Sequence, residues 1–579
     1  MALSLGSSAP PMEAIAGGHG GNAAAAAAAF VSLRAAGSPA ASSSVVRRAS
    51  KWKRDLVVCS SQEGVAPVED LEISTRLGSI SFPSRFLFGA ATSAFQVEGT
   101  AFGGRGDCIW KTFCREHPEK IADGSNGDIA ADSYHRYKED VEILADLGLD
   151  AYRFSISWPR ILPKGRGAVN KEGIQYYKNL IDELSDNGIE PFVTLFHWDV
   201  PQALEDEYGG FLNKKIVEDF KNYTRICFEE FGHKVKNWIT INEPLTFSDL
   251  GYCAGVHAPG RCTPGLAGYN CTAGDSLREP YIVAHNLLLA HAEAARLYKN
   301  EYQGKQNGKV GITLVSSWFE PYDRNSPHDL EAQQRAIQFN LGWFLDPLEF
   351  GDYPFSMRAL AGDRIPAFTE EESKKLKGSY DFIGINYYTA RYAKHVPIFK
   401  GINPQTYNDD VHADILIEKD GVPIEHAEPG SWINVYPRGL RELLTYIKSR
   451  YNNPAIYITE NGVLEVDDGS ALTKATVDTH RTEYLTLHLH ELTEAIRREA
   501  NVKGYFTWSL LDNFEWNNGY TNRLGLIYID YKDKTLKKGA DGEELLPDRT
   551  RTKKDSAQWL KRFLSIKRKP GMTFGPAKS

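Results

Sequence analysis

Eight short apolar runs recur along this chain, and longer amphipathic stretches separate them. Each run is apolar at nearly every position, which suits strands buried on both faces of a parallel sheet. The runs span residues 86–95, 151–158, 191–198, 235–242, 310–318, 381–388, 455–460 and 504–511. A doubly wound open sheet is the alternative, but no glycine-rich phosphate loop follows the first run. We therefore expect one α/β domain, a (β/α)8 TIM barrel with its catalytic loops at the C-terminal ends of the strands.

The first sixty residues differ in composition from the rest of the chain. They are rich in Ala, Ser and Gly, and Glu13 is their only acidic residue before Asp55. This composition is typical of an organelle transit peptide, and residues 57–60 (Val-Val-Cys-Ser) resemble a stromal processing site. We predict a plastid transit peptide at 1–60, a linker at 61–79, the barrel at 80–566 and a C-terminal tail at 567–579. The expected location is the chloroplast, after removal of the transit peptide.

Two observations favour other interpretations of the N-terminal segment. Its low complexity also fits a disordered tail without function. In addition, glycosylation sequons begin at Asn222 and Asn270, and such sites matter only in a secretory protein.

The bulk composition argues against several classes of function. The 579 residues carry a net charge of −8 with no basic cluster in the main body, which argues against nucleic acid as a partner. No apolar run is long enough to cross a membrane. Seven cysteines are too few and too scattered for a disulfide scaffold, and they include no zinc-type C-x-x-C pair. We expect neither a metal nor an organic cofactor.

Polar and aromatic side chains occur in seven of the eight runs or directly after them. They are Gln96, Arg153, His197, Asn242, Glu243, Tyr388, Glu460, Trp508, Glu515 and Trp516. A single residue of this kind is ordinarily a solvated loop residue or a satisfied core side chain. Barrel enzymes gather their active sites at the carboxyl ends of the strands, so the convergence of these residues indicates an active site.

Two of these residues, Glu243 and Glu460, end runs that lie across the barrel mouth from each other. Glycoside hydrolysis uses such a pair, with one carboxyl protonating the leaving oxygen and the other acting at the anomeric carbon. Arg153 and Tyr388 are candidates to support an ionised Glu460, by charge and by hydrogen bond. For Arg153 a structural ion pair at the barrel bottom is the alternative. The tryptophans offer flat apolar faces to a sugar ring, and the remaining polar residues offer hydrogen bonds to its hydroxyls.

Four segments resemble glycoside hydrolase family 1. Residues 240–244 (Thr-Ile-Asn-Glu-Pro) and 457–462 (Tyr-Ile-Thr-Glu-Asn-Gly) are similar to its two catalytic signatures, and residues 86–99 and 508–516 also resemble its motifs. The likeness extends from about residue 80 to about residue 564. It implies a retaining β-glucosidase that forms a covalent glucosyl-enzyme, with Glu460 as nucleophile and Glu243 as general acid/base.

The resemblance also implies how the sugar is bound. Glucose would be held by Gln96, His197, Asn242, Tyr388, Trp508, Glu515 and Trp516. Thioglucosidases of the myrosinase type carry Gln at the position of Glu243, so an O-glucoside is favoured here, because its poorer leaving group needs protonation. Glu515 occupies the region that holds phosphate in branches acting on 6-phosphosugars, so the expected sugar is neutral.

The aglycone side is inferred from similar plant members. There the aglycone lies against a Trp matched by Trp432, and the other wall positions match Leu250, His257 and Asn517. Residues 251–260 and 351–358 look closer to plastid glucosidases of steroidal saponins, such as furostanol glycoside and avenacosidase-like 26-O-β-glucosidases. The resemblance further pairs Cys262 with Cys271 in a loop disulfide. The expected substrate is a defensive plant O-glucoside, with a steroidal saponin as the first candidate.

Water is the expected second substrate, and a homo-oligomer is expected because plastid members often self-associate. Two other functions remain open at this point. A transglucosidase would pass glucose from Glu460 to an alcohol and would share every catalytic residue. A non-catalytic sugar-binding or aggregating barrel is the alternative from another class, although intact Glu243 and Glu460 count against it.

Overall fold

The computed structural model describes residues 77–398, 403–532, 537–538, 544–545 and 547–566. The predicted transit peptide (1–60), most of the linker (61–76) and the C-terminal tail (567–579) lie outside the described residues. Those domain boundaries therefore stay predictions.

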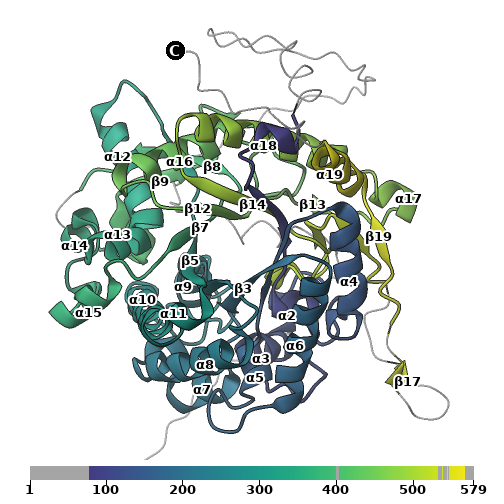
Figure 1. The fold of residues 1–579 in the computed structure, drawn as a ribbon. Helices are drawn as coiled ribbons and strands as arrows, with labels where there is room; N and C mark the ends of the chain where they lie inside the picture. The colour runs from purple at the N-terminus through teal and green to yellow at the C-terminus, as the bar shows by residue number, and fades with distance from the viewer. Residues whose placement is uncertain (1–76, 399–402, 533–536, 539–543, 546, 567–579) are drawn as a thin grey trace, which may run out of the picture.

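Eight parallel strands close into a barrel at the centre of the molecule (Figure 1). Their order around the barrel is β1-β14-β12-β7-β5-β4-β3-β2. The strands are β1 (Leu87–Ala91), β2 (Ala151–Ser155), β3 (Glu190–Phe196), β4 (Asn237–Asn242), β5 (Lys309–Val315), β7 (Phe382–Asn386), β12 (Ile456–Glu460) and β14 (Val502–Trp508). Nearly every strand residue is buried, because helices cover the outer face and side chains fill the inner one. The predicted (β/α)8 barrel is confirmed.

The strands end earlier than most of the apolar runs. The clearest case is the first run, residues 86–95, where β1 ends at Ala91 and helix α2 (Ala94–Val97) follows at once. The side chains of Phe95 and Val97 are buried in this helix, as they would be in a strand. Hydrophobicity alone could not mark the end of the strand for that reason.

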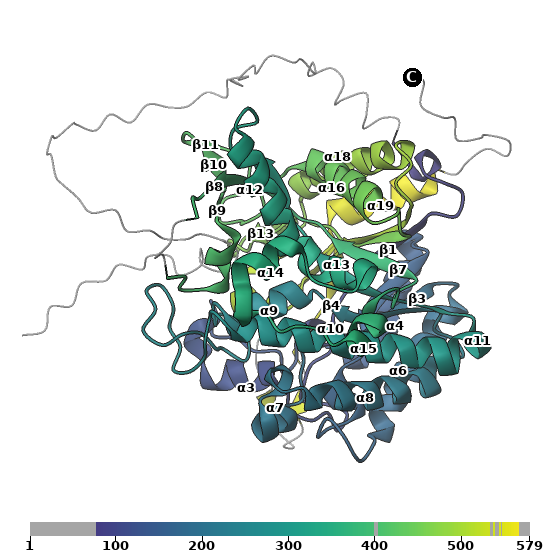
Figure 2. The same cartoon turned by 90° about the vertical axis from the view of Figure 1, so that its left-hand side faces the viewer.

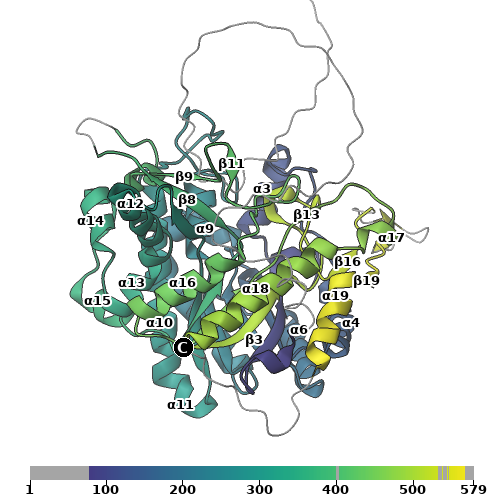
Figure 3. The ribbon, with the colours of Figure 1, turned by 90° about the horizontal axis from the view of Figure 1, so that it is seen from above.

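The long helices pack around the outside of the barrel. They are α4 (Ser133–Leu147), α6 (Lys171–Asp186), α8 (Lys215–Phe231), α10 (Glu279–Leu297), α16 (Pro437–Arg450), α18 (Thr479–Arg497) and α19 (Asp555–Ser565). Helix α8 shows the underlying pattern, because Ile216, Phe220 and Phe228 are fully buried on one face. Viewed from above, α16 and α18 lie side by side, and the last helix, α19, lies beside α4 (Figure 3).

Shorter elements complete the connections. The remaining helices are α3 (Ile109–Glu116), α5 (Trp158–Ile161), α7 (Gln202–Tyr208), α9 (Pro244–Tyr252), α11 (Gln303–Gln306), α12 (Pro327–Ile337), α13 (Trp343–Phe350), α14 (Phe355–Ala361), α15 (Glu370–Leu376) and α17 (Leu472–Ala475). Strands β6 (Trp318–Pro321), β8 (Ala390–His395) and β9 (Ala413–Leu416) form a three-stranded sheet. Figure 2 shows this region grouped with α12 and the pair β10 (Glu418–Lys419) and β11 (Val422–Pro423). Three further pairs are β13 (Glu465–Val466) with β15 (Asn522–Arg523), β16 (Ile527–Ile529) with β19 (Arg551–Lys553), and β17 (Lys537–Lys538) with β18 (Glu544–Leu545).

Aromatic side chains fill the interior of the barrel. The ring of Phe192 lies 4.8 Å from that of Phe506 and 5.1 Å from that of Tyr457, which in turn lies 5.2 Å from Phe382. All four are buried. The barrel is a packed core rather than a pore, so a substrate can be bound only at its ends. Among the described residues, no helix combines the length and apolar character needed to cross a bilayer.

Candidate active site

The carboxyl ends of the barrel strands open into one large cavity of about 1260 Å³. Eight of the predicted catalytic and sugar-binding residues line it, namely His197, Asn242, Glu243, Tyr388, Glu460, Trp508, Glu515 and Trp516. Gln96, in α2, and Arg153, in β2, lie directly behind the cavity wall and hydrogen-bond to residues that line it. The structure thus brings together residues from seven barrel strands or the segments that follow them.

Glu460 ends β12, and both of its carboxylate oxygens have a donor. Arg153, which is fully buried, donates from Nη1 to Oε1 of Glu460, and the Tyr388 hydroxyl donates to Oε2 at 2.7 Å. A guanidinium and a phenol aimed at one carboxylate form charge-assisted hydrogen bonds that stabilise negative charge on it. Arg153 therefore pairs with the Glu460 carboxylate at the C-terminal end of β12. The alternative, a structural ion pair at the barrel bottom, is wrong.

Glu243 follows β4 and caps helix α9. Its backbone is left-handed, with φ at 43°, a conformation that non-glycine residues adopt at a cost and that concentrates at functional sites. Asn386 donates to Oε1 at 2.6 Å and the Thr246 hydroxyl donates to Oε2 at 2.7 Å. Burial raises the pKa of Glu243 to about 7, and the nearby charge of Glu460 adds to this effect. This carboxyl is thus poised to carry a proton near neutral pH.

A short chain of hydrogen bonds joins the two carboxylates. The second guanidinium nitrogen of Arg153 donates to the side-chain oxygen of Asn242 at 2.6 Å. Asn386 donates to the same oxygen at 3.2 Å and to Glu243 at 2.6 Å. The two acids therefore hold a fixed relation to each other, although their environments differ.

Polar and aromatic groups surround the space beside the carboxylate pair. Gln96 donates to the Glu515 carboxylate at 3.3 Å, and Asn242 contacts His197 at 3.1 Å. The ring of His197 stacks between Trp508 and Trp516, at 5.8 and 5.9 Å. Burial, with a contribution from the charge of Arg153, holds the pKa of His197 well below its ordinary value, so this ring is neutral. Flat apolar faces next to paired polar groups suit a pyranose ring.

Glu515 differs from Glu460 in its surroundings. Burial, with contributions from the charges of Glu460 and Glu243, raises its pKa to about 8. Its hydrogen bond with Gln96 acts in the opposite direction and is the smallest of these effects.

Both apolar and polar side chains line the outer part of the cavity. The predicted aglycone residues Leu250, His257, Trp432 and Asn517 all line it. The Trp432 ring lies 5.7 Å from that of Tyr388, at the junction with the sugar side, and His257 contacts Asn517 at 3.1 Å. A disulfide joins Cys262 to Cys271 and closes the loop that carries the cavity-lining residues 263–269.

Two contacts of Glu243 and one contact of Asn242 were missed from the sequence. Asn386 ends β7, so its position at a strand end was a usable signal. Trp198 directly follows His197 and donates to the backbone oxygen of Asn242 at 2.9 Å. Thr246 stands one helical turn after Glu243, and nothing in the sequence distinguishes it from other threonines.

Two carboxyls in contrasting environments beside a polar and aromatic pocket are what glycoside hydrolysis requires, and the comparison with known proteins decides the family. The profile of glycosyl hydrolase family 1 matches residues 79–569. The chain belongs to glycosyl hydrolase family 1. It is a β-glucosidase and a retaining glycosidase, like the relatives it resembles over most of its length.

Two relatives and one solved structure illustrate the likeness of this family 1 enzyme. A furostanol glycoside 26-O-β-glucosidase from Hellenia speciosa is 57% identical over 491 residues, covering 84% of each chain. A chloroplastic β-D-glucosidase of a benzoxazinyl glucoside from Zea mays is 49% identical, covering 89% of this chain and 90% of that one. A rice β-glucosidase, solved in a covalent complex with glucose, has a TM-score of 0.80 and 46% identity, covering 85% of this chain and all of that one.

The raised pKa of Glu243 predicts the alkaline limb of the pH profile. The sequence predicts Glu243 as the general acid, and the protonated form that a general acid must have dominates below its pKa of about 7. For an alkyl β-glucoside, kcat/KM should therefore fall about tenfold per pH unit once the pH exceeds this pKa. The dinitrophenolate of dinitrophenyl β-glucoside leaves without protonation, so kcat/KM for this substrate should not fall at alkaline pH. If kcat/KM fell equally at alkaline pH with both substrates, the ionisation would belong to another group, such as Glu515.

Proposed function

We propose that this enzyme removes a terminal β-D-glucose from a plant O-glucoside by double displacement through a covalent glucosyl-enzyme. Glu460 is the nucleophile and Glu243 is the general acid/base. The observation that carries the assignment is the contrast between the two carboxyls. Arg153 and Tyr388 stabilise negative charge on Glu460, whereas burial raises the pKa of Glu243 to about 7.

In the first step one Glu460 oxygen bonds to the anomeric carbon, and the bond from that carbon to the aglycone oxygen breaks. Glu243 gives its proton to the departing oxygen, so the aglycone leaves as a neutral alcohol. In the second step water attacks the anomeric carbon, the bond from that carbon to the Glu460 oxygen breaks, and Glu243 takes a proton from the attacking water. Glucose is released with its configuration retained and Glu460 is again a carboxylate. The rice neighbour in its covalent complex with glucose supports this course.

We propose a bulky, largely apolar aglycone, with a steroidal saponin as the first candidate. The cavity of about 1260 Å³ is larger than glucose needs. Beyond the sugar side it is lined by Leu250, Trp432 and apolar residues such as Phe339 and Leu360. The 57% identical relative named for a furostanol glycoside points the same way.

Competing substrates test the aglycone. We expect kcat/KM to be about tenfold or more higher for a furostanol 26-O-β-glucoside than for p-nitrophenyl β-glucoside, because the steroid buries more apolar surface. Trp432→Ala should reduce this preference, whereas Phe350→Ala, at the exposed end of α13 and outside the cavity, should leave it unchanged. A parent enzyme that prefers the small aryl glucoside would contradict the steroidal assignment and leave the β-glucosidase assignment intact.

We further propose that the enzyme works in the plastid as a homo-oligomer. The Ser-rich, acid-poor segment 1–60 supports the location, as does the maize relative, whose name places it in the chloroplast. Import into isolated chloroplasts with cleavage near residue 60 tests the location. Light scattering of the purified enzyme tests the assembly.

A further inference from the structure

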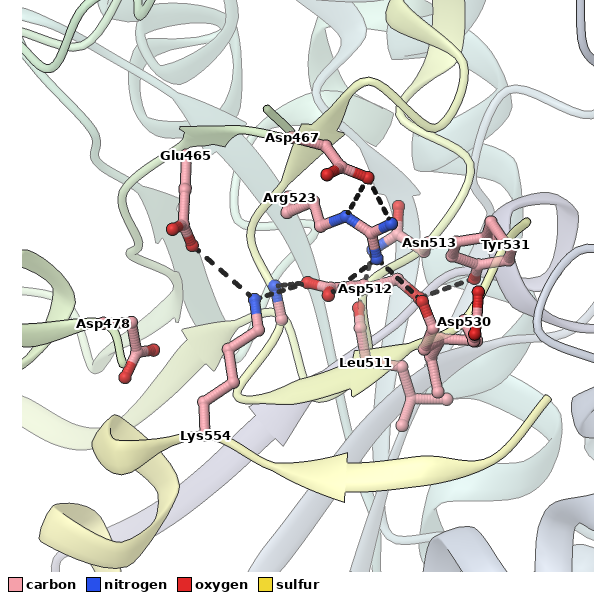
Figure 4. Close-up of polar contacts among 12 residues, drawn as sticks. Glu465, Asp467, Asp478, Leu511, Asp512, Asn513, Arg523, Asp530, Tyr531 and Lys554 are labelled. Carbon is pink, nitrogen blue, oxygen red and sulfur yellow. Dashed lines mark hydrogen bonds and ion pairs between the residues drawn. The ribbon is translucent and has the colours of Figure 1, made fainter. Parts of the chain in front are cut away.

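A network of charged residues, most of them buried, surrounds the Asp512 carboxylate (Figure 4). Its members come from segments far apart in the sequence, and the picture shows Lys554 and Arg523 meeting this carboxylate. They are Glu465 and Asp467 of β13 and its flank, Asp478 and Arg481 at the start of α18, Asp512 after β14, Arg523 of β15, and Lys554 directly before α19. None of them lines the cavity, so this network is not part of the sugar contact itself.

Asp512 is the centre of this network. Lys554 donates to Oδ1 at 2.9 Å, and the backbone N–H of Gly525 donates to the same oxygen at 2.9 Å. Arg523 donates to Oδ2 at 3.1 Å. The Asp512 side chain is 1% exposed and that of Lys554 is fully buried. Buried charges of this kind are held in place by their partners, because neither can turn to solvent instead.

The partners of Asp512 are themselves fixed. Arg523 donates to Asp467 at 2.6 Å and to the backbone oxygen of Ile529 at 2.7 Å. The backbone N–H of Lys554 donates to the oxygen of Leu526 at 3.0 Å. A Cβ added to Gly525 would lie 2.0 Å from the Asp512 backbone nitrogen. The backbones at Gly525 and Asp512 therefore lie too close together for a larger residue at position 525.

This network continues directly into the sugar side. Asn513, the next residue after Asp512, accepts from Gln96 at 2.9 Å, and Gln96 also donates to Glu515 at 3.3 Å. Leu524 directly follows β15, between Arg523 and Gly525, and lines the cavity. Its backbone oxygen accepts from Ser509 N–H at 3.1 Å. Movement of Asp512 would therefore displace both Glu515 and Leu524.

The structure assigns Lys554 as a positioning residue for glucose recognition: through Asp512 it fixes the segment that carries Glu515 and Trp516 and the segment that carries Leu524. The last strand and helix of the chain thus hold one wall of the sugar site. The inference rests on the proposed removal of glucose and on the sugar-binding role that the sequence predicts for Glu515. Lys554 touches no substrate, so it is not a catalytic residue.

The test uses ratios of kcat/KM, which do not depend on the fraction of folded enzyme in a preparation. The full-length chain is assayed with p-nitrophenyl β-glucoside, its 4-epimer the β-galactoside, and the β-xyloside, which lacks the C6 group. Glu515→Gln first defines which ratios depend on Glu515. Lys554→Met should shift the same ratios in the same direction, by about tenfold. A loss of stability alone would lower all three values equally.

Lys553→Met is the matched control, because Lys553 pairs with Asp146 at the surface and its side chain points away from this network. Its ratios should equal those of the parent. Unchanged ratios in Lys554→Met would overturn the inference. If that variant does not accumulate, Asp512→Asn decides by the same ratios. A Glu515→Gln enzyme with the parent's ratios would instead contradict the proposed role of Glu515.

Discussion

Glu460→Gln should lose on the order of 10⁴-fold or more in kcat with every β-glucoside, whatever its leaving group. The amide cannot form the bond to the anomeric carbon, and the oxygens held by Arg153 and Tyr388 in the parent no longer form a carboxylate. The measurement is steady-state hydrolysis of p-nitrophenyl and dinitrophenyl β-glucoside. In parallel, the parent incubated with a 2-fluoro glucoside should carry the label on the peptide that contains Glu460.

Glu349→Gln is a suitable control for this experiment. Glu349 lies in α13, accepts a hydrogen bond from the Tyr380 hydroxyl at 2.6 Å and does not line the cavity. This variant should hydrolyse glucosides like the parent. A Glu460→Gln enzyme as active as the parent, or a label on another peptide, would remove Glu460 from the nucleophile role.

Glu243→Ala should separate substrates by their leaving groups. A positioned acid contributes about 10²–10⁴-fold to proton transfer, so alkyl glucosides should lose that factor in kcat/KM. Dinitrophenyl β-glucoside should lose little in kcat/KM, although its turnover slows because water is no longer deprotonated. Azide needs no base and fits the space the carboxyl leaves, so it should restore turnover and yield a β-glucosyl azide. The measurement is turnover with and without azide, with the product identified by NMR.

The stereochemistry of that azide product separates the mechanisms. The β-anomer requires two displacements and therefore a covalent intermediate. An α-glucosyl azide would indicate direct attack on the substrate and contradict Glu243 as acid/base on a glucosyl-enzyme. Thr246→Val, which removes only one donor to Glu243, should remain insensitive to azide and serves as the control.

The fold could be predicted because the barrel leaves a strong record in the sequence. Strands buried on both faces need continuous apolar runs, and each must be followed by a helix to return the chain. The ends of the strands were less certain. In residues 310–318, strand β5 ends at Val315 and a separate strand, β6, begins at Trp318. Only Ser316 and Ser317 separate the two strands, and so short a break does not interrupt the apolar pattern enough to mark the change.

The proposed catalytic pair could be predicted because barrel geometry converts position in the chain into position in space. Glu243 and Glu460 each stand at a strand end, and strand ends meet at one rim. Their chemical difference could not be predicted in the same way. The pKa of Glu243, raised to about 7, depends on how completely it is buried and on the distance to other charges. Neither quantity is encoded by neighbours in the sequence.

The sequence by itself determined the barrel, its order of strands and helices, and the identity of the residues at its carboxyl rim, because these follow from periodicity and from the ends of the strands. Only the tertiary structure decided which side chains act together. Asn386 meets Glu243 across 143 positions, and Lys554 meets Asp512 across 42. Such pairs form because packing brings buried donors and acceptors together in places where water cannot be their hydrogen-bond partner. That selection depends on three-dimensional proximity, which no local pattern records.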